Sequence, residues 1–218
     1  MAARSGCPLA PFYFLKYAMT EVQEHGFIFE KWIKKILNID HLASNYTQKW
    51  DIPGELPISV KCMGAYNALE FSSAERMWEI DGDFLLIVAR WKQTGSNKVI
   101  TSIDELLFNK VILKKLRGDI TLDELRGAFN DKIKSFPPGR AGQEAGSAFA
   151  EQWKRGNSRK MGLLNIAAKL DSKMQRRVQC NLNYSNYVNL FGEPSGNLTF
   201  RGNKFEQTIK SSPRSFHE

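Results

Sequence analysis

Long hydrophobic runs, metal-binding clusters and phosphate loops are all missing from this sequence, and each absence removes a class of function. The short apolar runs, such as Phe84 to Val88, have the length of a buried strand, whereas a membrane span needs roughly 20 apolar residues. The apolar stretch 12–19 has only Arg4 ahead of it and no small-residue cleavage site. We therefore expect a cytoplasmic protein that is not embedded in a membrane.

Cysteine and histidine are scarce. The three cysteines, Cys7, Cys62 and Cys180, are an odd number, and no two have the spacing of a zinc knuckle or a redox motif. The three histidines are scattered. Neither a zinc site nor a disulfide framework is predicted, and a histidine-based hydrolase has little support. The sequence has no glycine-rich loop of the ATP-binding or dinucleotide-binding type, so no nucleotide cofactor is predicted.

Charge is unevenly distributed along the 218 residues. The formal net charge is +8, and residues 139–218 carry 13 Lys and Arg against 6 Asp and Glu, a net charge of +7. Residues 1–138 are nearly neutral, with 18 against 17. This asymmetry favours a polyanionic partner, nucleic acid before an anionic membrane surface, although an ordinary basic surface has the same composition. The length fits a single domain, 1–218, with a core region at 12–138 and a basic region at 139–218.

Hydrophobic periodicity and turn residues predict an α/β or α+β fold with a mixed central sheet flanked by helices. Pro137 to Ser147, which contains three glycines, is predicted to be a hinge or flexible loop. Capping-box spacings and apolar periodicity predict helices at 20–38, from 72 onward, at 102–116, 121–136 and 148–154. Short apolar runs between turn residues predict strands at 46–52, 58–63, 84–91, 99–101, 163–169 and 178–183, and a hairpin at 192–202.

Asp51 and Lys61 are the candidate chemical centre. The predicted hairpin places Asp51 on one strand and Ser59, Val60 and Lys61 on the next, and side chains 59 and 61 share one face because side chains alternate along a strand. Phosphodiester hydrolysis requires neutralised phosphate charge, an activated water and help for the leaving oxygen. Carboxylates that hold Mg²⁺ and a nearby lysine supply all three.

This pattern resembles the PD-(D/E)XK nuclease superfamily, which includes the type II restriction endonucleases. The resemblance covers residues 26–90. Its pieces are GFIFE at 26–30, the aspartate of WDI at 50–52, SVK at 59–61, and a following helix and apolar strand. The resemblance rests on the order and spacing of these pieces.

The resemblance implies a restriction-endonuclease-like fold and a role for each matching residue. Asp51 is implied to bind Mg²⁺, and the carbonyl of Val60 to coordinate the same ion. Lys61 is implied to assist the attacking water, and Glu30 to support the site from the first helix.

Ser59 departs from the family pattern, which places a second acidic residue at this position. Some restriction enzymes with SVK recruit a glutamate from the following helix, and thirteen residues separate the lysine of SVK from Glu75, the spacing of such enzymes. Glu75 is therefore the candidate second metal ligand, and Glu70 and Glu30 are the alternatives. Glu75 also fits a capping box with Ser72, which requires no catalytic role.

The other candidates have ordinary structural interpretations as well. Glu30 lies at the margin of the apolar helix face and can pair with Lys34 one turn later. Asp51 can be a turn aspartate that precedes Pro53. Lys61 can reach water from an exposed strand face.

The basic region contains a DNA-like patch of cations, amides and guanidinium groups. If 178–183 is a strand, Arg177, Gln179 and Asn181 share its polar face, where such groups contact phosphates and base edges. A solvated cationic edge strand is the alternative. The candidate DNA-contacting residues are Arg155, Arg159, Lys160, Lys169, Lys173, Gln175, Arg176, Arg177, Gln179 and Asn181.

The sequence therefore predicts a Mg²⁺-dependent, site-specific endonuclease that hydrolyses double-stranded DNA, with a type II restriction enzyme as the narrower hypothesis. A repair nuclease or resolvase of the same superfamily is an alternative. A homodimer would cut both strands of a palindrome symmetrically. In the rival hypothesis the protein binds nucleic acid without catalysis, and Asp51 and Lys61 form an ordinary cross-strand ion pair.

Overall fold

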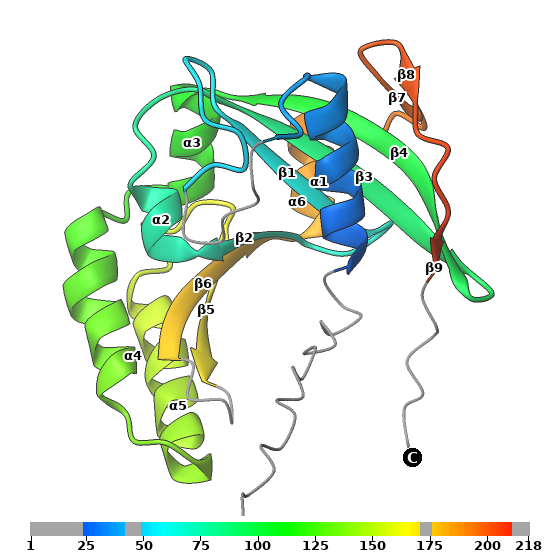
Figure 1. Cartoon of the computed structure of the whole chain (residues 1–218). Helices are drawn as coiled ribbons and strands as arrows, with labels where there is room; N and C mark the ends of the chain where they lie inside the picture. Colours follow the sequence, from blue (N-terminus) through cyan, green and yellow to red (C-terminus); the bar gives the residue numbers. More distant parts are fainter. Residues whose placement is uncertain (1–23, 42–48, 171–175, 211–218) are drawn as a thin grey trace, which may run out of the picture.

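The computed structural model describes residues 24–41, 49–170 and 176–210. They form a mixed α/β fold in which a curled mixed sheet is flanked by helices (Figure 1). In chain order the elements are α1 (Glu24–Ile36), β1 (Ile58–Gly64), β2 (Leu69–Ser73), α2 (Ala74–Trp78), β3 (Phe84–Thr94), β4 (Asn97–Phe108), α3 (Lys110–Arg117), the π-helix η1 (Glu124–Asp131), α4 (Lys132–Ser135), α5 (Arg140–Gly156), β5 (Asn165–Leu170), β6 (Arg176–Leu182), α6 (Tyr184–Phe191), β7 (Thr199–Phe200), β8 (Asn203–Lys204) and β9 (Ile209–Lys210).

The four-stranded sheet, which we call sheet A, has the strand order β1-β3-β4-β9. Strand β1 pairs with β3 in parallel, whereas β3 pairs with β4 and β4 with β9 in antiparallel. The prediction of a central strand at 84–91 is confirmed, because β3 has a partner on each side and Phe84, Leu86 and Val88 are buried. The strand predicted at 58–63 is confirmed as β1.

Sheet A is covered on both faces. Phe29 and Ile33 of α1 belong to one hydrophobic cluster with Val60 and Ile87. The opposite face belongs to a second cluster, which includes Tyr187 of α6. Because side chains alternate along a strand, neighbouring residues of β3 belong to different clusters: Leu86 and Val88 to one, Ile87 and Ala89 to the other.

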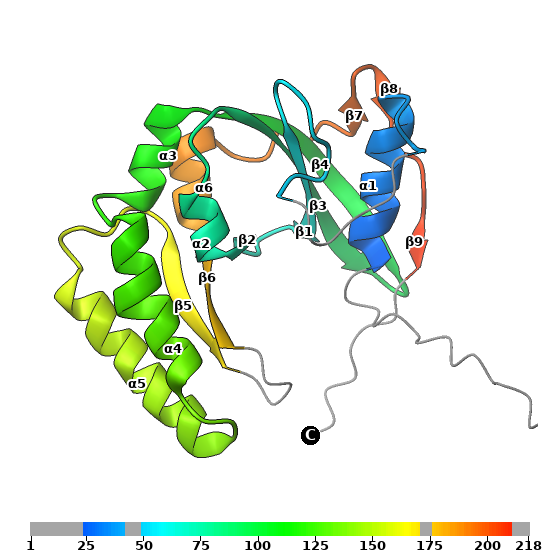
Figure 2. The same ribbon diagram turned by 60° about the vertical axis from the view of Figure 1, so that its left-hand side comes forward.

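The three-stranded sheet, which we call sheet B, has the order β2-β6-β5 and is antiparallel. Val178, Cys180 and Leu182 of β6 are buried in a cluster with Phe129 of η1 and Trp153 of α5. The strands predicted at 163–169 and 178–183 are thus confirmed with shifted ends. Figure 2 shows an arch in which sheet A with α1 forms one arm, and sheet B backed by α4 and α5 forms the other.

The hairpin predicted between 46–52 and 58–63 is reduced to one antiparallel bridge. Ile52 and Ile58 exchange both backbone hydrogen bonds, at 3.0 and 2.9 Å, and residues 49–51 form no strand. Pro53 and Pro57 flank this bridge and have no N–H to donate, which is consistent with so short a ladder. Residues 46–48 lie outside the described residues.

The helix predicted at 102–116 begins later than expected, since β4 continues to Phe108 and α3 starts only at Lys110. Ser102 is 2% exposed and lies opposite Arg90 of β3, so its spacing to Glu105 is not a cap. Pairing with β3 outweighs the local signal. The true cap is Asn109, whose side chain accepts a hydrogen bond from the Ile112 N–H.

The hinge predicted at Pro137 to Ser147 is wrong, because α5 begins at Arg140. Gly142 and Gly146 are buried, and their missing side chains permit close packing. A Cβ at Gly142 would lie 1.8 Å from the Pro137 carbonyl oxygen. The helix predicted at 148–154 is confirmed as part of α5.

The remaining helix predictions have mixed outcomes. The Thr121–Glu124 capping box is confirmed by hydrogen bonds in both directions. The cap of α2 is Ser73, not Ser72, so Glu75 is not part of a capping box. Helix α6 was not predicted. Residues 20–23, where the first helix was expected to start, lie outside the described residues. The hairpin predicted at 192–202 is shifted toward the C-terminus, since β7 lies in this range but its partner β8 lies beyond it. None of the helices in the described ranges is long and apolar enough to cross a membrane.

Candidate active site

Asp51 is held by three groups of β1. The Ser59 hydroxyl donates a hydrogen bond of 3.0 Å and the Val60 N–H one of 2.6 Å to the same oxygen, Oδ2. The Lys61 ammonium nitrogen lies 3.6 Å from this oxygen. The side chains of Asp51 and Lys61 are 31% and 27% exposed, so both reach solvent. The structure therefore brings together the aspartate, serine and lysine that the sequence singled out.

The open edge of β1 explains this arrangement. Strand β1 is the end strand of sheet A, and the N–H and C=O of one residue point to the same side of a strand. Ile58 and Val60 turn their N–H groups to the open edge, where Ile52 and Asp51 accept them. The Val60 carbonyl faces the same edge as its N–H. A carboxylate and a main-chain carbonyl are thus available at one position beside Lys61.

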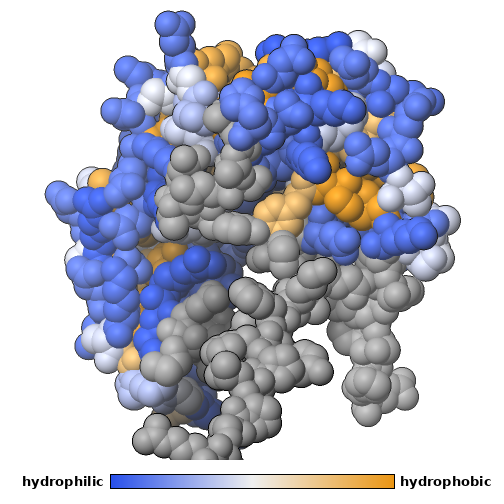
Figure 3. Space-filling model, viewed as in Figure 1, coloured by the Kyte–Doolittle hydropathy of each residue, from blue (hydrophilic) through white to orange (hydrophobic). Residues whose placement is uncertain are grey.

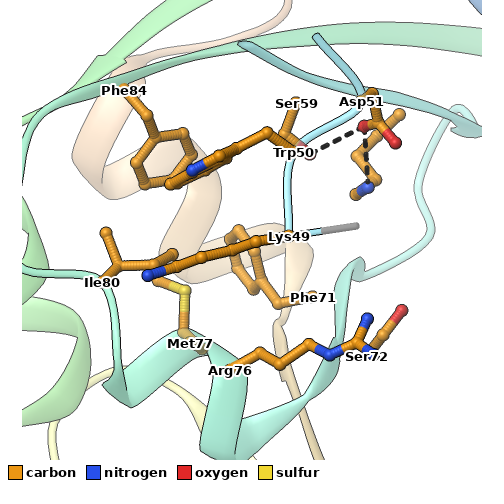
Figure 4. Close-up of a pocket in the computed structure, with 11 residues that line it drawn as sticks. Lys49, Trp50, Asp51, Ser59, Phe71, Ser72, Arg76, Met77, Ile80 and Phe84 are labelled. Carbon is orange, nitrogen blue, oxygen red and sulfur yellow. Dashed lines mark hydrogen bonds and ion pairs between the residues drawn. The ribbon is translucent and has the colours of Figure 1, made fainter. Parts of the chain in front are cut away.

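A cavity of about 240 Å³ lies against this edge, between β1 and α2. Trp50, Phe71 and Phe84 contribute an aromatic wall, and Figure 4 shows Asp51 and Ser59 on one side and α2 on the other. The lining residues are Lys49, Trp50, Asp51, Ser59, Lys61, Phe71, Ser72, Arg76, Met77, Ile80 and Phe84. Three cations and one carboxylate therefore face this cavity, which favours an anionic ligand.

Two of these cations were missed at the sequence level. Arg76 lies on α2, is exposed, and forms no ion pair with any described residue. Lys49 donates to the Glu79 carbonyl (3.0 Å) at the end of α2 and lies over the Trp50 ring. No local pattern distinguishes them, because the packing of α2 against β2, β6 and η1 places Arg76 at the cavity, and the contact of Lys49 with the end of α2 places Lys49 there.

Glu75 points elsewhere. Its Oε1 accepts a 2.6 Å hydrogen bond from Arg126, and its Oε2 accepts one of 2.9 Å from Asn130. Both partners belong to η1, and Glu75 is not among the residues that line the cavity. The structure thus does not bring this glutamate to Asp51.

Glu30 pairs with Lys34 at 2.7 Å, as its alternative interpretation predicted. It lies on α1, which packs against the face of β1 that carries Val60, and it is not among the residues that line the cavity. Glu70 lies on β2 in sheet B, where partial burial raises the pKa of its carboxyl, while a hydrogen bond from Asn181 and the charge of Lys169 lower it. Neither glutamate supplies a second carboxylate beside Asp51.

The donor set limits the metal that this site can hold. Within residues 24–41, 49–170 and 176–210, no group of three or more His, Cys, Asp or Glu side chains is placed to bind a metal ion. The Asp51 carboxylate and Val60 carbonyl are hard oxygen donors. Mg²⁺ keeps several waters and binds through one or two carboxylates together with substrate phosphates, so these donors fit Mg²⁺ only with a phosphate present.

The polar face of sheet B has the predicted composition. Arg177, Gln179 and Asn181 alternate with buried residues of β6. Register places Lys169 opposite Arg177, and places Asn165 opposite Asn181 on the same face. Figure 3 shows hydrophilic side chains over β6 and β5, on the face turned away from α4 and α5.

The other DNA candidates are not all on this face. Arg155 belongs to α5, which packs against the opposite face of sheet B, and Lys160 pairs with Glu124. Arg159 is exposed, and Arg176 is partly buried. Lys173 and Gln175 lie outside the described residues.

Comparison with known proteins identifies no relative of this chain. No family model, no curated protein and no solved structure matches it. Its function is therefore inferred from the geometry of the site and the sequence alone.

Proposed function

We propose that the protein is a Mg²⁺-dependent, site-specific endonuclease that hydrolyses double-stranded DNA, with a restriction-endonuclease-like fold. The observation that carries this proposal is the convergence of Asp51, Ser59 and Lys61 at the open edge of β1, in a cavity lined by three cations and one carboxylate. Such a cavity is suited to a phosphodiester.

Each side chain has a definable task. The Asp51 carboxylate and Val60 carbonyl would hold Mg²⁺, which when bound neutralises phosphate charge and lowers the pKa of a water. Lys61 donates hydrogen bonds that orient the attacking water, and Asp51 fixes the position of its ammonium group. The Arg76 guanidinium, which pairs with no carboxylate in the described part of the chain, would bind a phosphate oxygen from the other side of the cavity.

Sheet B provides the surface that selects the DNA. Arg, Gln and Asn are the side chains that pair with guanine and adenine edges, and Arg177, Gln179 and Asn181 present them in a row two residues apart. Lys169 and Arg177 supply charge for phosphates.

Separate assays of cleavage and binding test the proposal. With a short duplex that carries a mapped cut site, Asp51→Asn should lower the cleavage rate at least about 100-fold and leave the dissociation constant nearly unchanged. Gln179→Ala should instead weaken binding of this duplex by about 1–3 kcal/mol relative to duplexes of other sequence. Lys31→Ala, on the exposed surface of α1, is the matched control and should change neither. Cleavage by Asp51→Asn at the wild-type rate would refute the assignment.

Non-catalytic DNA binding is the second candidate, and one observation favours it. Lys61 already neutralises the one carboxylate of the cavity, and no second acid lies beside it in the described residues. Under this alternative the duplex is bound equally well without Mg²⁺ and stays intact. Light scattering on the protein–DNA complex tests the associated homodimer, since a single copy per duplex would contradict symmetric cutting.

A further inference from the structure

A second cavity, of about 220 Å³, lies near the other end of β1 and is not used by the proposed nuclease site. Arg90 pairs with Met63, whereas Ser59 pairs with Leu86, so Arg90 lies four residues farther along β3. At 3.3 Å per residue this is about 13 Å. The lining residues are Ala65, Tyr66, Arg90, Lys92, Thr101, Ser102, Tyr184, Glu193, Pro194 and Gly196.

Arg90 is a buried cation at the wall of this cavity. It is 1% exposed and forms no ion pair with any described carboxylate. Its Nη1 donates to the carbonyls of Ala65 (2.9 Å) and Asn67 (3.2 Å), and its guanidinium carbon lies 4.3 Å from the Tyr187 ring centroid. Its Nε and Nη2 make no hydrogen bond of normal geometry with any described residue, although the guanidinium lies near the Tyr187 hydroxyl and opposes the rise in the pKa of that hydroxyl that burial causes. Because an uncompensated buried charge is costly, an anion nearby would stabilise Arg90.

The neighbouring polar side chains of Ser102 and Asp104 form no ion pair or hydrogen bond with the Arg90 guanidinium. Ser102, opposite Arg90 in register, is 2% exposed, and its hydroxyl also has no partner among the described residues. Asp104 accepts a 2.9 Å hydrogen bond from the Ser195 N–H and so fixes the loop that closes the cavity. Asp104 lies on the same face of the sheet, two residues beyond Ser102, and forms no ion pair with Arg90; its Oδ2 is buried and also has no hydrogen-bond partner among the described residues.

The walls of the cavity supply a planar surface and a second cation. Tyr66 is 68% exposed, which is high for an aromatic ring, and meets Tyr184 edge to face at 5.4 Å. The Lys92 ammonium lies 5.6 Å from the Tyr66 ring centroid. Glu193 accepts a 2.7 Å hydrogen bond from the Tyr184 hydroxyl and offers an acceptor at the rim. A ligand that uses all of these groups has a flat ring, an oxyanion and a hydrogen-bond donor.

We propose that this cavity binds a nucleoside monophosphate, with the base stacked on Tyr66 and the phosphate toward Lys92 and the charge of Arg90. Glu193 accepts a hydrogen bond from the ribose or from a base amino group. Such a site needs no glycine-rich phosphate loop, because side-chain cations replace backbone N–H groups. It does not depend on the proposed nuclease activity.

Calorimetric titration of the full-length protein tests this site. The probes are the four common nucleoside 5′-monophosphates, with the matching nucleosides and inorganic phosphate. We expect saturable binding of at least one monophosphate, tighter than that of its nucleoside or of phosphate, and an affinity loss of about tenfold in Tyr66→Ala and in Lys92→Ala. Both side chains are exposed, so both variants should fold, which thermal melting confirms.

Lys61→Ala and the exposed Lys110→Ala are the controls and should bind the nucleotide like the wild type. If binding is lost in Lys61→Ala but kept in Tyr66→Ala, the nucleotide occupies the Asp51 cavity and the proposal is wrong. Absence of saturable binding, or equal binding of inorganic phosphate, also overturns it. DNA cleavage by Tyr66→Ala is measured in a separate assay. Failure of the nucleotide-site proposal can thereby be told apart from failure of the proposed nuclease function.

Discussion

Replacement of Gly142 by alanine tests how α5 packs behind the sheet that carries the proposed DNA-binding face. The new Cβ would lie 1.8 Å from the carbonyl oxygen of Pro137 and 2.8 Å from its carbonyl carbon. Both atoms belong to the backbone, so no rotamer change relieves the contact. The backbone at Pro137 must therefore move away from α5 by roughly 1 Å or more to relieve the overlap.

The magnitude follows from two opposing effects. Overpacking against rigid atoms costs about 3 kcal/mol, and replacing a helical glycine by alanine returns about 1 kcal/mol. Gly142→Ala should thus lower the free energy of unfolding by about 2 kcal/mol. At a urea m-value of about 2 kcal/mol per molar, the midpoint falls by about 1 M.

Urea denaturation followed by tryptophan fluorescence measures this change. Gly156→Ala, in the last turn of the same helix, is the matched control, because a Cβ there meets no atom within 4 Å. Its midpoint should equal that of the wild type or exceed it slightly. Equal midpoints for Gly142→Ala and the wild type would refute the close packing and restore the flexible loop that the sequence predicted.

Three further substitutions test local features of the cavity wall and of the surface. Ser73→Ala removes the cap of α2 and should lower the free energy of unfolding by about 1 kcal/mol in the same assay. Ser72→Gly should be neutral or stabilising, because Ser72 has a left-handed φ of 63°. A larger loss of stability in Ser72→Gly than in Ser73→Ala would contradict this. Hydrogen bonds from Lys160 and from the Thr121 backbone lower the pKa of Glu124 to about 2. The contribution of the Glu124 carboxylate to stability is therefore present above the ordinary pKa of 4.5 and is lost as the pH falls toward 2. Glu124→Gln should flatten the dependence of the free energy of unfolding on pH in that window. An unchanged slope would exclude this role for Glu124.

The strongest local patterns predicted the fold where tertiary context agreed with them. The apolar run that begins at Phe84 became the central strand, and the Thr121–Glu124 spacing became a real cap. The same spacing failed at Ser102, because eleven residues of β4 pair with β3 and a local cap cannot compete with that ladder. Gly142 was misread because a glycine required for close packing looks, in sequence, like one required for flexibility.

The residues of the candidate site likewise fall into those that local spacing predicted and those whose position depends on tertiary packing. Asp51 and Lys61 were predicted to meet because a short turn joins their segments, and the structure places them 3.6 Å apart. The position of Arg76 depends on how α2 packs against β2, β6 and η1, which no sequence spacing reveals. Glu75 was misassigned because its partner Arg126 lies 51 residues away in the chain.

Incubation of the protein with a mixed-sequence plasmid, with and without Mg²⁺ and beside Lys61→Ala, tests the proposed function most directly. We predict discrete fragments that require Mg²⁺ and that Lys61→Ala produces at least about 100-fold more slowly, while its DNA binding is retained. A plasmid that stays intact across varied salt, divalent ion and sequence, despite measurable DNA binding, would contradict the nuclease assignment and establish a binding protein instead.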